Sequence, residues 1–127
     1  MRRRRTRPLW ADAWFLPSLV TLLMLQGCTT PDPASQYQND PEALARGEAV
    51  FVGTCGGYCH VEGTAVADVP DLFDCAWIHG GSNQEIFNTI ANGVPGSRMV
   101  AFGGKLPDGD EDIWKIIAFL KNDGSSC

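Results

Sequence analysis

Residues 54–60 read TCGGYCH, which places Cys55, Cys59 and His60 close together in the chain. Thiols and imidazole bind metal ions, and cysteines also form covalent bonds with prosthetic groups. A structural zinc site usually takes four ligands as two close pairs, and no second pair follows here. The motif Cys-x-x-Cys-His attaches haem covalently, but in this chain three residues separate the cysteines. The stretch therefore indicates a haem attachment motif with one extra residue.

The front of the chain is typical of a removable export signal. It begins with MRRRRTRP and continues with an uncharged run of 15 residues, 13–27, interrupted by Pro17. This run is shorter than the roughly 20 residues of a membrane-spanning helix. It ends in LQGC, and residues 25–28 resemble the lipobox of bacterial lipoproteins, in which the cysteine is lipidated and becomes the first residue.

These features predict a lipoprotein signal peptide over residues 1–27, a flexible tether over 28–39 and one small domain over 40–127. Cys28 would carry the lipid. An ordinary signal peptide that happens to contain Cys28 is the alternative.

The charge of the expected mature protein excludes one class of partner. Removing residues 1–27 takes away five arginines and Asp12, which leaves five basic and 14 acidic residues, a formal charge of −9. Such a surface repels phosphate backbones and anionic lipids. We therefore expect no nucleic-acid partner, and a membrane anchor made of acyl chains alone.

Two segments carry the start signals of helices. Asp40, Pro41 and Glu42 supply a cap, a proline at the first helical position and an acid in the first turn, which predicts a helix over 41–54. Ser82 and Glu85 form a capping box before a helix of about ten residues that stops at a glycine, residue 93.

The last predicted helix begins in the acidic run 108–112, which we expect to be solvated, and ends near Lys121. Its buried face repeats at helical spacing through Ile113, Ile116, Ile117 and Leu120. No segment shows the alternation of a strand, so we predict an all-α domain. Three short helices bury only a marginal core, which a large apolar cofactor would complete.

Separated pieces of the chain, in one order over residues 40–122, resemble a class I c-type cytochrome. They are a first helix with Gly47 and Phe51, the cysteine and histidine motif, a methionine in a loop, and a last helix with Trp114. The resemblance implies a small fold of three main helices wrapped around one covalently bound haem c with its iron. It also implies that the first and last helices cross, glycine against aromatic.

The resemblance assigns residues to the haem. Cys55 and Cys59 would carry it, His60 would be the proximal iron ligand, and Met99, in the loop 93–106, would be the distal one. Met99 is the only methionine outside the expected signal peptide, which supports this assignment. The carbonyl of Pro70 would accept the hydrogen bond of the His60 ring and fix its tautomer. A plain loop proline is the alternative.

Other residues are weaker candidates. Trp77 would reach a haem propionate by a hydrogen bond and Arg98 by its charge, with core packing and solvation as the competing interpretations. His79 is a rival distal ligand, although a solvated histidine is commoner in a turn. The extra residue of the motif falls beside Gly56 and Gly57, which we expect to bulge outward with positive φ.

The remaining cysteines allow two interpretations. Five cysteines are present in a chain expected to reach an oxidising compartment. With lipid on Cys28 and haem on Cys55 and Cys59, Cys75 and Cys127 remain, and these two would close a disulfide across a long loop. In the alternative, Cys127 is a terminal thiol and Cys75 is a small buried apolar residue.

An iron with imidazole and thioether ligands has no vacancy for oxygen, peroxide or substrate. We therefore expect an electron carrier rather than an enzyme, held by lipid on a periplasm-facing membrane, with the outer membrane as one location. Residues 77–99 resemble cytochromes that serve periplasmic quinoprotein dehydrogenases. We expect redox proteins as partners, with such a dehydrogenase as donor and an oxidase or another cytochrome as acceptor. Two alternatives stay open: a haem sensor or peroxidase-like protein in which Met99 leaves the iron, and a disulfide-stapled binding lipoprotein without haem.

Overall fold

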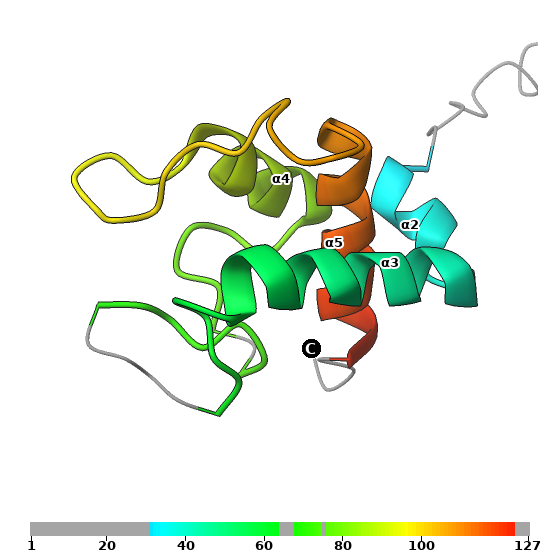
Figure 1. The fold of residues 1–127 in the computed structure, drawn as a ribbon, viewed down its shortest axis with the longest axis horizontal. Coiled ribbons are helices and arrows are strands. Elements are labelled where there is room, and N and C mark those ends of the chain that lie inside the picture. Colours follow the sequence, from blue (N-terminus) through cyan, green and yellow to red (C-terminus); the bar gives the residue numbers. More distant parts are fainter. Residues whose placement is uncertain (1–30, 64–67, 75, 124–127) are drawn as a thin grey trace, which may run out of the picture. The chain divides into compact units, whose positions relative to one another are not determined.

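The described part of the chain is helical. The computed structural model describes residues 31–63, 68–74 and 76–123. They form helices α2 (Pro33–Tyr37), α3 (Pro41–Phe51), α4 (Asn83–Asn92) and α5 (Asp110–Asp123), with a π-helix, η2 (Val52–Gly56), directly after α3 (Figure 1). These ranges contain no strand, so the all-α prediction is confirmed for them. The predicted signal peptide, Cys28, Cys75 and Cys127 lie outside the described residues.

The starts of α3 and α4 are those that the sequence predicts. The Asp40 carboxylate accepts hydrogen bonds of 3.0 and 3.2 Å from the amides of Glu42 and Ala43. At the start of α4, the Ser82 hydroxyl accepts from the Glu85 amide, and the Glu85 carboxylate accepts from the Ser82 amide. These caps set where each helix begins, and so which residues face the interior.

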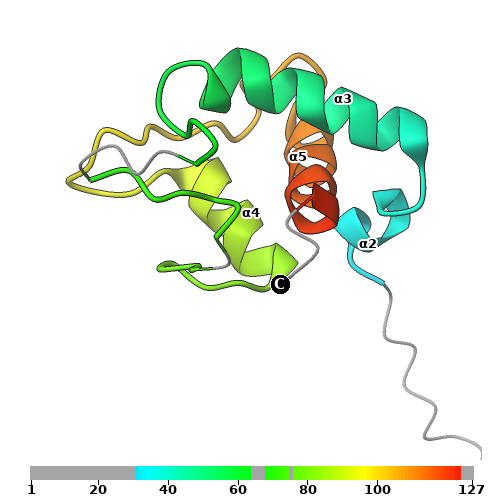
Figure 2. The same cartoon turned by 90° about the horizontal axis from the view of Figure 1, so that it is seen from below.

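Helices α3 and α5 cross at a glycine. Figures 1 and 2 show α3 lying across α5. An added Cβ at Gly47 would overlap the carbonyl oxygen of Lys115 and lie 2.6 Å from its carbonyl carbon. The predicted close approach is therefore confirmed, but the glycine faces helix backbone. Trp114 stacks on Phe87 of α4, with ring centroids 4.2 Å apart and an angle of 14° between the planes.

Helix α2 is packed into the domain, contrary to the prediction of a flexible tether over residues 28–39. Asp32 caps it, and Ala34 is fully buried. The helix packs against α5, and the Asn83 side chain donates a 2.9 Å hydrogen bond to the Asp32 carboxylate. The burial of Ala34 and the Asp32 cap therefore hold this segment against the domain, although its polar composition had indicated a flexible tether.

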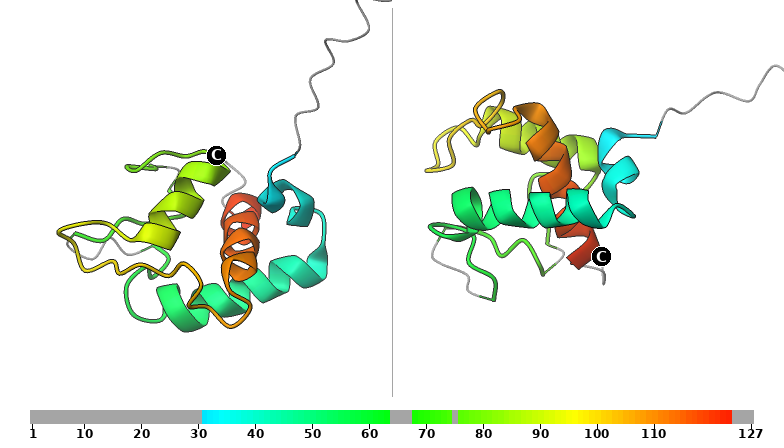
Figure 3. Two further views of the ribbon diagram at one scale, coloured as in Figure 1. Left: turned by 90° about the horizontal axis from the view of Figure 1, so that it is seen from above. Right: turned by 45° about the vertical axis from the view of Figure 1, so that its right-hand side comes forward.

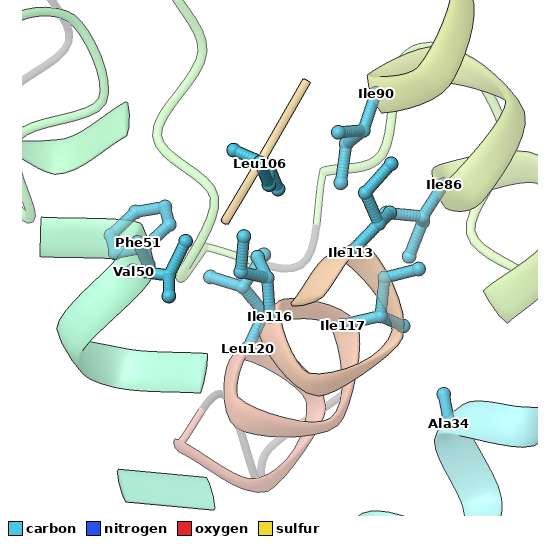
Figure 4. Close-up of a cluster of buried hydrophobic side chains, with 10 residues drawn as sticks. All are labelled: Ala34, Val50, Phe51, Ile86, Ile90, Leu106, Ile113, Ile116, Ile117 and Leu120. Carbon is cyan, nitrogen blue, oxygen red and sulfur yellow. The ribbon is translucent and has the colours of Figure 1, made fainter. Parts of the chain in front are cut away.

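The core centres on α5. The predicted face of this helix is at most 1% exposed at Ile113, Ile116, Ile117 and Leu120. Figure 4 shows this face surrounded by side chains of the other elements: Ala34, Val50, Phe51, Ile86, Ile90 and Leu106. The rings of Phe51, Phe73 and Phe119 lie with their centroids 5.7 to 6.2 Å apart.

An ion pair joins α3 to the first turn of α5. The Arg46 guanidinium donates two hydrogen bonds of 2.9 Å to the Asp112 carboxylate, which is fully buried. Burial alone would raise the pKa of Asp112, but bonds from Arg46 and the Asp108 amide outweigh it and hold the pKa below its ordinary value. The acidic run expected to be solvated therefore has one buried, structural member.

No helix in the three described ranges combines the length and the apolar character that crossing a membrane requires.

Candidate haem site

One cavity is lined by most of the residues that the sequence singled out. It has a volume of about 290 Å³, near the lower end of the range for small-molecule sites. Its wall comes from the helices and from the loops after η2 and α4, and both loops lie on the same side of α5 in the two panels of Figure 3. The predicted residues that line it are Cys55, Cys59, His60, Pro70, Trp77, His79, Arg98 and Met99.

Much of the remaining wall is apolar. It includes side chains from α3, α4 and α5, namely Phe51, Ile86, Ile90, Ile116 and Leu120. These residues also belong to the core, so the cavity opens directly from the packed interior. Such a wall suits a large flat apolar group with polar groups at its edge.

The cysteine motif continues from a π-helix. The α-helix predicted to reach residue 54 ends at Phe51, and η2 follows it without a break. The Gly57 amide donates to the Val52 carbonyl at 2.9 Å, and the His60 amide donates to the Cys55 carbonyl at 3.0 Å. Both bonds span five residues, as in a π-helix.

The expected outward bulge at the two glycines is wrong. Gly57 has a φ of −66°, and Gly56 also has no positive φ. The extra residue is instead taken up within helical turns, because a π-helical hydrogen bond encloses one residue more than an α-helical bond.

The His60 ring is oriented by a backbone carbonyl. Its Nδ1 lies 3.0 Å from the carbonyl oxygen of Pro70, the contact that the resemblance implies. A carbonyl oxygen only accepts, so Nδ1 carries the proton in this hydrogen bond. Nε2 is then the nitrogen with the free lone pair, which is the state that a metal ligand requires.

The two thiols of the motif are free and half-buried. Burial, with a smaller contribution from the charge of Cys59, raises the pKa of Cys55 to about 11. The Cys55 thiol therefore stays protonated at neutral pH. In the described ranges no three His, Cys, Asp or Glu side chains are grouped to hold a metal ion.

Met99 is placed by a short hydrogen-bonded loop. The Val94 amide donates to the Met99 carbonyl at 3.0 Å, and the Met99 amide donates to the Ser97 hydroxyl at 3.1 Å. Gly93 ends α4 with a φ of 69°, and an added Cβ there would lie 2.6 Å from the Met99 carbonyl oxygen. The predicted helix stop thus also lets the Met99 segment return close to α4.

Trp77 has a polar atom without a partner. Its Nε1 is buried, and it is the one buried side-chain polar atom in the described part of the chain that lacks a hydrogen bond. Buried polar atoms are rarely left unpaired, so this N–H indicates an acceptor on a bound group.

Lys121 holds the Trp77 ring from the end of α5. Its ammonium lies 4.7 Å from the ring centroid and donates a 2.8 Å hydrogen bond to the Gly81 carbonyl. Sequence analysis missed this role, because a lysine in the last turn of a helix is already explained by the helix dipole.

Arg98 and His79 are exposed, although both line the cavity. Arg98 forms a 2.8 Å ion pair with Asp68, and its hydrogen bond and charge hold the pKa of Asp68 below the ordinary value. Arg98 therefore already has an anionic partner. No sequence pattern links these two residues, which lie 30 positions apart.

A helical domain in which a cysteine and histidine motif and a methionine line one apolar cavity is typical of a c-type cytochrome. Comparison with known proteins narrows this class. The sequence profile of a family described as cytochrome c oxidase, cbb3-type, subunit III matches residues 42–120. The chain belongs to this family, and its cofactor is covalently bound haem c with iron.

Three curated relatives resemble part of the chain. It is 36% identical over 66 residues to the cbb3-type cytochrome c oxidase subunit CcoP of Rubrivivax gelatinosus, covering 51% of this chain and 21% of that protein. It is 40% identical over 73 residues to the subunit FixP of Sinorhizobium medicae, covering 50% and 25%. It is 33% identical over 72 residues to a CcoP subunit of Azospirillum, covering 48% and 24%.

The chain thus spans a quarter or less of the length of these relatives. No solved structure gives a significant match.

Three independent features of the cavity fit haem c. Its apolar wall suits the porphyrin, the free thiols of Cys55 and Cys59 suit the two vinyl groups, and the unpaired N–H of Trp77 suits a haem carboxylate.

Proposed function

We propose that this protein is an exported, membrane-anchored monohaem c-type cytochrome that carries single electrons between redox partners and is not an enzyme. One observation carries the proposal: His60, with Nδ1 engaged by Pro70, lines the same cavity as Met99. Imidazole and thioether are the axial ligands of electron-transfer cytochromes c.

His60 and Met99 would be the two axial ligands of the iron, and the motif of Cys55 and Cys59 would hold the porphyrin covalently. When bound, haem c supplies an iron that changes its charge by one electron. With His60 and Met99 both bound to the iron, no coordination position would be left for oxygen, peroxide or a substrate. The carbonyl of Pro70 would raise the basicity of His60 as a ligand, and the thioether of Met99 would favour the reduced iron.

The other residues of the cavity would bind and orient the cofactor. The apolar side chains of α3, α4 and α5 that line the cavity would exclude water from it. The Trp77 N–H would donate to a haem carboxylate, with Lys121 fixing the indole ring. A carboxylate that accepts this bond is stabilised in its charged form.

The partners would be redox proteins. The relatives are subunits of cbb3-type cytochrome c oxidases, which supports an oxidase or another cytochrome as the electron acceptor. A periplasmic quinoprotein dehydrogenase is the proposed donor, from the resemblance of residues 77–99. Lipid on Cys28 would anchor the protein on a periplasm-facing membrane, with the outer membrane as one location.

Optical spectra test the ligand assignment. We expect the purified wild type to show a low-spin haem, the weak near-infrared band of methionine ligation and no rapid binding of carbon monoxide. The Met99→Ala variant should lose the band and bind carbon monoxide. Val52→Ala serves as the control, because Val52 is 55% exposed and does not line the cavity, and it should behave as the wild type. A high-spin wild type that binds carbon monoxide rapidly would favour the sensor or peroxidase-like alternative.

A further inference from the structure

The attachment motif contains one residue more than Cys-x-x-Cys-His, and helical hydrogen bonds account for that residue. An α-helical bond joins residues four apart, whereas a π-helical bond joins residues five apart. The Cys55 carbonyl accepts a bond from the His60 amide at 3.0 Å, which spans the motif from its first cysteine to its histidine, and an α-helical bond from the Cys59 amide at 3.1 Å. A second bond of this kind, from the Gly57 amide to the Val52 carbonyl at 2.9 Å, lies three residues earlier in the chain.

The consequence is that the longer motif still presents its three reactive side chains to one place. With the usual spacing, the histidine follows the first cysteine by four residues, which is one α-helical bond. Here it follows by five, which is one π-helical bond. Cys55, Cys59 and His60 all line the cavity.

We propose that this π-turn allows both Cys55 and Cys59 to bond to the same haem, and that Gly57 permits the turn. The inference deepens the proposed function and rests on it. Each S–H would add across one vinyl double bond, with sulfur joining the carbon next to the porphyrin ring and hydrogen joining the terminal carbon. Nothing leaves and no net electrons move, so the step needs only reduced thiols, the form in which both occur.

Two glycines of this region differ in their surroundings, which provides a matched pair of variants. An added Cβ at Gly57 would lie 3.0 Å from the Val52 carbonyl oxygen, the atom that accepts the Gly57 amide. An added Cβ at Gly53 would meet no atom within 4 Å outside its own helix backbone. The φ of Gly57 is −66°, which any residue can adopt. Glycine is therefore needed at this position because the Val52 carbonyl oxygen lies close to it, and not because the backbone is left-handed.

The test is mass spectrometry of the haem-bearing peptide after alkylation of free thiols. In the wild type we expect haem bonded to both cysteines and neither cysteine alkylated. Gly57→Val should give a several-fold larger fraction with one alkylated cysteine, while Gly53→Val should match the wild type. Deletion of Gly57 restores the usual spacing, so an α-turn suffices and both bonds should remain. The wild type and this deletion decide the matter even if Gly57→Val does not accumulate.

Three results would overturn the inference: one alkylated cysteine in the wild type, equal fractions for Gly57→Val and Gly53→Val, or loss of one bond when Gly57 is deleted. Each of them leaves haem attached to the chain, so the proposed function survives. A wild type without any covalent haem refutes the proposed function itself, and the inference falls with it.

Discussion

Replacing Gly47 by alanine tests the helix crossing that supports the cavity. The new Cβ would overlap the Lys115 carbonyl oxygen and lie 2.6 Å from the Lys115 carbonyl carbon. Carbon atoms pack best at roughly 3.5–4.0 Å, so α3 and α5 would have to separate by about 1 Å. The contact is with backbone, which cannot rotate away as a side chain can.

The magnitude follows from two opposed terms. Overpacking of this kind costs about 3 kcal/mol, the upper part of the usual range. Alanine recovers about 1 kcal/mol through its higher helix propensity. The net loss is about 2 kcal/mol, which corresponds to a melting temperature lower by about 8–16 °C in a domain of this size.

Thermal unfolding of the haem-loaded protein, followed by circular dichroism at neutral pH, measures this loss. Gly53→Ala is the control, since its Cβ meets no atom within 4 Å beyond its own helix, and it should lose no stability and gain at most about 1 kcal/mol from helix propensity. A Gly47→Ala protein as stable as the wild type would refute the reasoning, because the helices would then tolerate the added methyl group.

Two further predictions concern charged and polar groups. Asp112→Asn removes a carboxylate whose folded-state pKa lies below its ordinary value, so its stabilising effect is full above about pH 4 and is lost as the pH falls through the folded pKa. We expect denaturant unfolding to show the variant about 2 kcal/mol less stable at pH 7, with the difference shrinking in acid; a constant difference would contradict this. Trp77→Phe removes the proposed donor to a haem carboxylate, so that carboxyl group should titrate at higher pH in potentiometric measurements of the haem. Trp114→Phe, which alters a ring stacked on Phe87, should leave the titration unchanged, and equal shifts in both variants would exclude a specific role for Trp77.

Local physics explains the parts of the fold that could be predicted. Asp40, Ser82 and Glu85 cap their helices through bonds between residues two or three apart, so the chain carries the signal directly. The buried face of α5 repeats at helical spacing and needs no knowledge of its partners.

Other features depend on distant parts of the chain. The Arg46–Asp112 pair joins residues 66 positions apart, and α2 is fixed by the burial of Ala34 against α5. No local pattern distinguishes such residues from solvated ones.

The candidate site also has features that could be predicted from the sequence and features that could not. The place of Met99 in its loop and the contact of His60 with Pro70 followed from motif order and resemblance. The π-turn did not, because a bulge and a π-turn both accommodate one extra residue, and the two glycines beside it permit either. The contact of Lys121 with Trp77 joins residues whose types and positions suggest nothing about each other.

A denaturing gel stained for haem tests the central claim most directly, that haem is bonded to this chain at the motif of Cys55 and Cys59. The wild type should give a stained band at the position of the protein, and the double variant Cys55→Ser, Cys59→Ser should give none. A wild type without a band, or a band that persists in the double variant, would contradict the account.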